Sequence, residues 1–305
     1  MAIVWKISVI NLDKGAFLDG VILQKAPFTY SGRISSISNL FKVIRSYSIP
    51  RFSKAKIQLV VGDFRIETST DENGSFHEFI DQRLSGEVKV ISGNESLEIV
   101  QDYPIIFDTT AGEFDVISDI DDTIMVSHTA NAMKRIGTLA FKGPERREAI
   151  PFMQKLLEKF TELDARIIYV SKSEANLFNM IASIIKHHHL PQGALILTPY
   201  LKLKQLFTYD KGKDYKLKHI TQILERSEVK KFVLIGDDSQ KDMEVYAQIV
   251  STFPARVLRV YIRQTRSHRD KKHKNTWEKI KATGVSARYF KSNDDADDEF
   301  KFYKL

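Results

Sequence analysis

Four aspartates stand in two short motifs that lie far apart in the sequence. Asp119 and Asp121 belong to the run DIDDT, and Asp237 and Asp242 belong to the run GDDSQKD. Carboxylates that gather in one place repel each other, and a bound divalent cation relieves that repulsion. Oxygen ligands with no histidine or cysteine beside them favour Mg²⁺ over other metals. The motifs therefore predict an Mg²⁺ ion held between Asp119 and Asp237.

A second group of polar residues has the chemistry to bind an anion. Ser171, Lys172 and Ser173 follow an apolar run, and Lys216 opens the stretch that leads to the second acidic motif. A serine hydroxyl and the backbone N–H groups beyond it can bind phosphate oxygens, and a lysine neutralises charge that develops in the transition state. An ion-bound Asp119 beside such a site can attack phosphorus. The set predicts a phosphohydrolase with Asp119 as its nucleophile.

This chemistry requires a scaffold that brings distant segments together. After residue 112, short apolar runs alternate with longer helical stretches, which predicts a mostly parallel sheet covered by helices on both faces. Ligands of such sheets bind at the carboxyl ends of the strands, where the polar motifs stand. The expected strands are Phe114–Ser118, Arg166–Val170, Leu195–Leu197, Lys231–Ile235 and Arg256–Ile262, and the expected helices are Ile150–Leu163, Ala175–His187, Lys216–Glu225 and Asp242–Thr252.

The first third of the chain has the pattern of a β-sandwich, with several short alternating runs and regular turns. Lys56–Val61, Phe64–Thr70 and Ser75–Ile80 alternate, and the polar turn Asp71–Gly74 between the last two predicts a hairpin. The run TSTDENGSF resembles the hairpin of transthyretin-like modules. Apolar residues at helical spacing in Ile34–Tyr47 predict a helix packed on the sandwich, with a helix lying on lipid as the alternative.

Composition sets the broad class. The 305 residues are enough for two domains, and the net charge of +7 favours anionic partners. The absence of cysteine excludes disulfides and thiolate metal sites. The sequence shows no signal-peptide pattern and no apolar run of about 18 residues. We therefore expect a soluble, cytoplasmic protein that can lie at the periphery of a membrane.

The order of the polar motifs resembles a known enzyme superfamily. DIDDT, then VS after a strand, then a lysine, then GDDSQKD is similar to the four motifs of the haloacid-dehalogenase (HAD) superfamily of phosphatases. This resemblance implies a HAD-like Rossmannoid parallel sheet. An acid two residues after the nucleophile, here Asp121, resembles the phosphatase and mutase branch. Such an acid can protonate the leaving alcohol and then deprotonate the water that hydrolyses an aspartyl-phosphate.

Longer stretches resemble one family within this superfamily. SDIDDTI, IIYVSKS, FVLIGDDSQKDMEVYAQIV and RVLRVYIR are similar to the phosphatidate phosphatases associated with actin patches, relatives of the lipins. The resemblance implies an Mg²⁺-dependent lipid phosphate phosphatase of lipid metabolism. The roles that it implies are Asp119 as nucleophile and metal ligand, Asp121 as acid/base and carbonyl ligand, Ser171 as phosphate binder, Lys216 as charge stabiliser, Asp237 as metal ligand and Asp242 as an additional ligand.

With this resemblance the chain divides into three expected parts. Residues 1–112 form the smaller β-sandwich (transthyretin-like) domain with its inserted helix. Residues 113–291 form the HAD-like phosphatase domain. Residues 292–305 form an acidic tail, which we expect to be mobile.

The expected substrate pocket departs from that family in three places, one of them the run DSQKD after Gly236-Asp237, where the family more often has SGQHD. Lys172 stands where the family has an uncharged residue, and Glu174 follows Ser173 where the family has proline. We expect Lys172 and Ser173, together with Thr123 and Arg263, to contact the substrate. The departures leave a soluble phosphate ester or a polynucleotide end as alternative substrates, and a non-catalytic lipid-binding module as an alternative function.

The sequence does not decide between neighbouring residues for two of the roles in the site. Asp122 and Asp238 are alternative metal ligands, with Asp238 competing with Asp242 for the additional position. Lys213 and Lys218 are alternatives to Lys216 as the motif lysine.

Two further stretches bear on partners. The basic run Arg263–Lys274 predicts an electrostatic collar for an anionic head group or membrane surface, with a solvated loop as the alternative. Nucleic acid is not expected, because aromatic residues do not interleave these charges. Met125–Arg147 predicts either an amphipathic lid or plain packing. The oligomeric state is left open.

Overall fold

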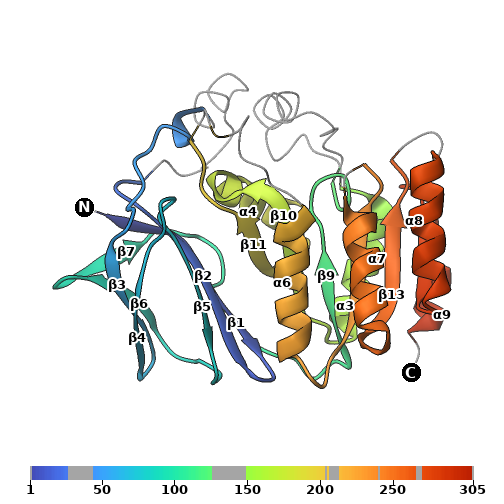
Figure 1. Ribbon diagram of the computed structural model, residues 1–305, viewed down its shortest axis with the longest axis horizontal. Helices are drawn as coiled ribbons and strands as arrows, with labels where there is room; N and C mark the ends of the chain where they lie inside the picture. The colour runs from blue at the N-terminus through green and yellow to red at the C-terminus, as the bar shows by residue number, and fades with distance from the viewer. Residues whose placement is uncertain are drawn as a thin grey trace.

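The computed structural model folds the chain into two sheets, the second of them flanked by helices (Figure 1). It describes residues 2–26, 44–125, 149–202, 205, 213–239, 241–265 and 270–303. The predicted helix over Ile34–Tyr47 and the predicted lid over Met125–Arg147 lie outside these residues except at their ends. Within the described residues, no helix is long and apolar enough to cross a bilayer.

The second sheet is parallel throughout and has the order β11-β10-β9-β12-β13-β14. It confirms the α/β class, and the predicted strands and helices are present within a few residues of their predicted bounds. Strand β14 and helix α8 are absent from the sequence-based prediction. The strands are β9 (Phe114–Ser118), β10 (Ile167–Glu174), β11 (Ala194–Thr198), β12 (Lys231–Asp237), β13 (Val257–Arg263) and β14 (Ser286–Phe290), and the helices are α3 (Pro151–Glu162), α4 (Phe178–His187), α6 (Lys213–Arg226), α7 (Asp242–Thr252), α8 (Lys271–Ala282) and α9 (Asp297–Phe302).

The path of the chain through this sheet determines where a site can form. From β9 the chain runs outward through β10 and β11, then returns to the other side of β9 and continues through β12, β13 and β14. Helices α6, α7 and α8 cover the near face in Figure 1, and α3 lies behind it. The direction of winding therefore reverses between β9 and β12. A crevice opens at such a switch point, at the carboxyl ends of the strands.

The first sheet has the order β4-β3-β6-β7-β1-β2-β5, with β8 paired to β1. Strands β1 and β2 are buried along their whole length, because one of their faces packs into the core of the first sheet and the other into the core of the parallel sheet. Val9 and Leu18 face the core of this sheet, whereas Ile10 and Phe17 join the core of the parallel sheet. The strands are β1 (Ile3–Leu12), β2 (Gly15–Leu23), β3 (Lys56–Val61), β4 (Phe64–Ser69), β5 (Ser75–Ile80), β6 (Val88–Ser92), β7 (Glu95–Ile99) and β8 (Ile106–Phe107).

The predicted hairpin around Asp71–Gly74 is wrong in its pairing. The turn exists: the Asp71 carboxylate accepts the backbone N–H groups of Asn73 and Ser75 at 2.7 and 2.9 Å. However, β4 pairs with β3, and β5 pairs with β2 at the other end of the sheet order. The turn residues determine only that the chain changes direction. The pairing of β5 with β2 depends on the burial of apolar side chains such as Phe76.

The prediction of a mobile acidic tail is also wrong in part, because residues 297–302 form helix α9. Its Glu299 is 4% exposed. The Glu299 carboxylate accepts the Tyr261 hydroxyl at 2.5 Å and pairs with Arg259 at 2.8 Å, and Arg288 also contacts it. The sequence alone gives no sign that Glu299 is buried, because its partners lie on β13 and β14, far from it in the chain.

A buried polar cluster joins the first sheet to helix α6. Lys6 and Asp19 form an ion pair between β1 and β2, and His77 of β5 bonds to the other Asp19 oxygen at 2.9 Å. His219 of α6 lies beside them, with its ring 6.0 Å from that of His77 and 5.6 Å from that of Phe17. The His219 Nδ1 atom is buried without a hydrogen-bond partner among the described residues.

We predict that His219 makes the stability of the fold depend on pH. Burial lowers the pKa of His219 from 6.5 to about 4. Between these values the unfolded chain binds a proton that the folded chain excludes, so stability falls as the pH drops from about 6.5 toward 4, by about 3 kcal/mol in total. His219→Gln should remove this part of the pH dependence in urea unfolding curves. His187→Gln, at an exposed position, is the control, and an unchanged slope in His219→Gln would contradict the prediction.

Candidate active site

Three aspartates from distant parts of the chain meet at the switch point. Asp119 directly follows β9, and its backbone N–H donates to Ile235 of the neighbouring strand at 2.9 Å. Asp237 ends β12, and Asp242 begins α7. One carboxylate oxygen from each lies within 4.8 Å of the others, and all three side chains are buried. The structure therefore brings together Asp119 and Asp237, as the metal prediction requires, with Asp242, the residue predicted as an additional ligand.

Gly236 allows this close approach. A Cβ atom at this position would lie 2.8 Å from the Asp242 Cβ atom and 2.8 Å from the Tyr246 ring. Real Cβ atoms essentially never approach other atoms so closely. The start of α7 can therefore lie against the end of β12 only because residue 236 has no side chain.

Lys216 links two of the three carboxylates. Its ammonium group is fully buried and lies 2.8 Å from Asp119 Oδ1 and 2.7 Å from Asp242 Oδ1. Burial alone would lower the pKa of Lys216, but the two carboxylates outweigh that effect and raise its pKa. Lys218, by contrast, is exposed. Among the described side chains, Lys216 is thus the lysine that the structure places in the site.

The remaining carboxylate oxygens fit a metal ion. Asp119 Oδ2 and Asp242 Oδ2 are buried without a hydrogen-bond partner among the described residues. Burial raises the pKa of Asp119 well above its ordinary value, and burial together with the charge of Asp242 raises the pKa of Asp237 to about 7. Unpaired buried oxygens are costly, and a divalent cation would satisfy them. The acidic triad of Asp119, Asp237 and Asp242 can therefore hold a metal ion.

Asp238 and Asp122 do not belong to this triad. Asp238 Oδ1 accepts the Thr265 N–H at 2.8 Å and also the Thr265 hydroxyl, while Oδ2 accepts the Tyr289 hydroxyl at 2.8 Å. Asp122 has a left-handed backbone with φ of 54°. Between Asp238 and Asp242, the geometry favours Asp242 as the additional ligand, because the Asp238 carboxylate already has three donors.

The phosphate-binding candidates approach from β10. The Ser173 hydroxyl donates to Asp121 Oδ2, and the Ser173 N–H donates to Ser171 Oγ at 3.1 Å. Lys172 is half-buried; burial first, and the charge of Lys216 next, lower its pKa. The contact with Ser173 places Asp121 beside the end of β10. The role of Asp121 as a carbonyl ligand stays a prediction.

Two predicted substrate contacts have structural partners instead. The Thr123 hydroxyl is fully buried and donates to Asp237 Oδ2 at 3.3 Å. Arg263 is 8% exposed, donates to the Asp122 carbonyl oxygen at 2.6 Å, and donates twice to the Ser292 hydroxyl at 3.1 and 2.9 Å. Arg263 therefore holds the loop after β9 in place. Contact of either side chain with substrate stays a prediction.

Sequence reasoning missed the residues that support the site. Thr265 and Tyr289 fix Asp238, and Ser292 fixes Arg263. These are ordinary polar residues outside the motifs, and their partners are neighbours only in the folded chain. The sequence carries no local signal that identifies them.

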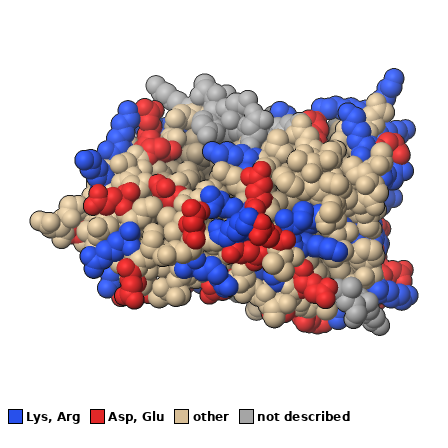
Figure 2. Space-filling view, turned by 60° about the horizontal axis from the view of Figure 1, so that its bottom comes forward, with Lys and Arg blue, Asp and Glu red and all other residues tan. Residues whose placement is uncertain are grey.

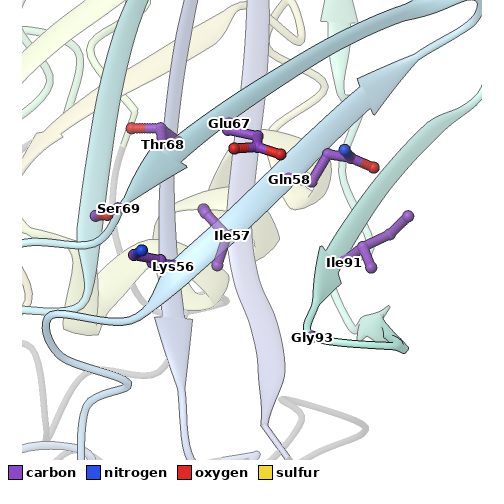
Figure 3. A pocket seen from close by; sticks show the side chains of 8 residues that line it. All are labelled: Lys56, Ile57, Gln58, Glu67, Thr68, Ser69, Ile91 and Gly93. Carbon is purple, nitrogen blue, oxygen red and sulfur yellow. The ribbon is translucent and has the colours of Figure 1, made fainter.

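A hollow of about 350 Å³ on the first sheet is separate from these residues (Figure 3). It is lined by β3, β4 and β6, with Gln58 and Glu67 among its polar side chains and Ile57 and Ile91 among its apolar ones. None of the carboxylates of the acidic triad lines it.

The parallel sheet matches the catalytic domain of a known phosphatase family. Residues 114–264 match the family model described as phosphatidate phosphatase APP1, catalytic domain. The matched segment includes β9 through β13 and all three members of the acidic triad. Through this segment the chain is similar to the APP1 phosphatidate phosphatase family, a family of hydrolases.

Individual relatives are distant. An uncharacterized protein of Schizosaccharomyces pombe is 23% identical over 221 residues, which is 69% of this chain and 36% of that protein. Phosphatidate phosphatase APP1 of Saccharomyces cerevisiae is 28% identical over 151 residues, which is 48% of this chain and 25% of that protein. The chain thus spans only about a third or a quarter of the length of these relatives.

Similarity to solved structures is weaker still. The class C acid phosphatase of Bacillus anthracis aligns with a TM-score of 0.31 and 18% identity, covering 48% of this chain and 63% of that one. A TM-score of this size carries no argument about the fold.

We predict that a divalent cation stabilises the folded chain, and more so at higher pH. Without a cation, Asp237 is protonated below its pKa of about 7, well above the ordinary 3.8, so stability falls as the pH rises through this range. A cation replaces the protons, and at a hundred times its Kd it adds about 2.7 kcal/mol. Thermal unfolding with and without Mg²⁺ at pH 6 and pH 8 measures the effect.

The matched variants for this measurement are Asp237→Asn and Asp102→Asn, the latter at a carboxylate that is 97% exposed. The Mg²⁺-dependent shift should vanish in Asp237→Asn and persist in Asp102→Asn. Equal shifts in both would contradict a metal site at the acidic triad.

Proposed function

We propose that this chain is an Mg²⁺-dependent phosphomonoesterase that acts through an aspartyl-phosphate on Asp119. One observation carries the proposal: Asp119 Oδ1 is held by Lys216, while Oδ2 is buried and unpaired beside two further carboxylates. One oxygen is thus fixed, and the other is directed into a cluster of oxygen ligands. That is the arrangement of a metal-bound nucleophile.

The donor set supports Mg²⁺ as the ion. Asp119, Asp237 and Asp242 offer hard oxygen ligands. Mg²⁺ is usually bound by a small number of protein carboxylates, with water and substrate phosphate as the remaining ligands. Bound there, the ion would keep Asp119 ionised at neutral pH and offset the charge of a phosphate dianion.

The residues of this chain then divide the chemistry. Asp119 attacks phosphorus in line with the leaving oxygen, and the P–O bond to the alcohol breaks as the aspartyl-phosphate forms. Asp121 gives its proton to the alcohol and afterwards takes one from the water that releases phosphate. The contact of Asp121 with Ser173 supports this role, because it holds the carboxyl group at the end of β10. Ser171 and Lys172 bind the phosphoryl oxygens.

The proposed substrate is phosphatidate or a similar lipid phosphate. The match of residues 114–264 to a phosphatidate phosphatase family supports this choice. A soluble phosphate ester or a polynucleotide end is the alternative. Binding without catalysis is disfavoured, because every catalytic position of the motif pattern is filled.

We propose peripheral contact with an anionic lipid surface. Lys271 and Lys274 are exposed at the start of α8, whereas Lys272 pairs with Glu244 at 2.5 Å. The rest of the basic run, residues 266–269, lies outside the described residues. Among the described residues on the face that Figure 2 shows, basic and acidic side chains alternate and form no single basic surface. That mixture does not favour a nucleic-acid partner.

Asp119→Asn should lower phosphomonoester hydrolysis by more than about a thousandfold, because the amide cannot form the acyl phosphate. Acid-quenched protein should also lack the phosphoenzyme that the wild type accumulates. The control is Asp122→Asn, a neighbouring carboxylate outside the triad whose left-handed backbone suits asparagine. Retained turnover in Asp119→Asn, or equal loss in both variants, would remove Asp119 from its role.

A lipid substrate predicts dependence on a lipid surface. The rate on a short-chain phosphatidate should rise when the same molecule is presented in mixed micelles or anionic vesicles, since the exposed lysines attract such surfaces. The measurement compares kcat/KM for dispersed and surface-bound substrate, each with Mg²⁺. A rate that ignores the surface, together with faster hydrolysis of water-soluble esters, would favour the soluble alternative.

A further inference from the structure

The N-terminal sheet reaches the phosphatase site at the end of β10. The Trp5 indole N–H donates to the Ala175 carbonyl oxygen at 2.8 Å, and Trp5 is 2% exposed. Ala175 directly follows β10, two residues after Ser173. Trp5 lies where the register of β1 against β2 shifts, and irregularities of this kind re-aim a side chain. The irregular strand therefore directs a buried donor at the backbone that carries the phosphate-binding residues.

The same turn is tied to the loop after β11. Asn176 exchanges two hydrogen bonds with Leu201, at 3.1 and 2.8 Å. Arg51, from the N-terminal region, donates to the Tyr200 carbonyl oxygen at 3.2 Å, and the Tyr200 hydroxyl donates to the Ser46 carbonyl oxygen. N-terminal residues thus hold both loops on this side of the site.

Helix α6, which carries Lys216, is held in the same way. His219 lies one turn beyond Lys216 and packs against Phe17 of β2. At the end of the helix, the Arg226 carbonyl oxygen accepts the Lys14 N–H at 2.9 Å, and the Arg226 guanidinium pairs with Asp81 at 2.8 Å. The N-terminal sheet therefore contacts α6 both at its middle and at its end.

The metal-binding side of the site has different supports. The Asp237–Asp238 segment is held by Thr265 and Tyr289, and the loop after β9 is held by Arg263. These supports lie in the C-terminal half of the parallel sheet. The two sides of the site thus depend on two separate parts of the chain.

We propose that the N-terminal sheet is a working part of the phosphatase, in which Trp5 is a positioning residue that aligns the phosphate-binding end of β10. As far as turnover is concerned, this inference rests on the proposed function. It assigns the N-terminal sheet a task in catalysis rather than a separate binding role.

Trp5→Phe in the full chain tests the proposal, because phenylalanine keeps an aromatic ring and removes only the donor. The Ala175 carbonyl oxygen then loses the indole donor and keeps only the Phe178 N–H, so the turn after β10 can shift. Since small displacements of positioning groups cost up to about 100-fold in rate, we expect kcat/KM for p-nitrophenyl phosphate to fall about tenfold or more. The inhibition constant of inorganic phosphate should rise by a similar factor.

The affinity for Mg²⁺, measured by calorimetry, should stay within about twofold of the wild type, because the metal-binding side has its own supports. The control is Val90→Ala, a fully buried position in the core of the first sheet on β6. Val90→Ala should lower stability at least as much as Trp5→Phe and leave kcat/KM and phosphate inhibition unchanged. This separates a positioning effect from a general loss of stability.

Wild-type kinetics and phosphate affinity in Trp5→Phe would overturn the proposal, as would equal effects of Trp5→Phe and Val90→Ala. If Trp5→Phe does not fold, Arg51→Met removes the hydrogen bond to the Tyr200 carbonyl oxygen, and the same assays on this variant then test the proposal. If the wild type hydrolyses no phosphomonoester, the proposed function fails, and calorimetric binding of inorganic phosphate with Mg²⁺ then tests the positioning claim by itself.

Discussion

Repulsion between buried carboxylates is the constraint on which the rest of this structure depends. Asp119, Asp237 and Asp242 are buried, and each places an oxygen within 4.8 Å of the others. The single ammonium group of Lys216 compensates only part of that charge. Either protons or a cation must supply the remainder, which is why burial raises the pKa of Asp237 to about 7. A fold that maintains such a cluster does so at a cost in stability, which the proposed metal-dependent function would explain.

The fold holds the cluster by dividing the supports between two parts of the chain. Parallel strands β9 and β12 place Asp119 and Asp237 at adjacent strand ends, and Gly236 lets α7 bring in Asp242. C-terminal residues fix this side, while Trp5 and Phe17 of the N-terminal sheet contact the segments that carry Ser171 and Lys216. Because residues of β1 and β2 belong to both cores, the two sheets pack against each other.

The sequence predicts the parts of this structure that depend on local pattern. Strand β9 and helix α7 have their predicted bounds, and the polar residues that follow the strands meet at one edge as the parallel-sheet rule requires. It does not predict features set by distant partners. Strands β1 and β2 lack alternation because both faces are buried, β5 pairs away from β4, and Glu299 is buried by arginines on other elements. Trp5 has no motif, since its role depends on a strand irregularity and a carbonyl 170 positions away.

The most direct test is calorimetric titration of the chain with Mg²⁺ at pH 7 in buffers of different ionisation enthalpy. Such a series gives the number of ions bound and the number of protons released on binding. A site built from carboxylates with raised pKa values predicts one ion per chain and a net release of protons, both lost in Asp237→Asn. Absence of binding, or binding without proton release that survives in Asp237→Asn, would contradict a metal ion at the carboxylate cluster.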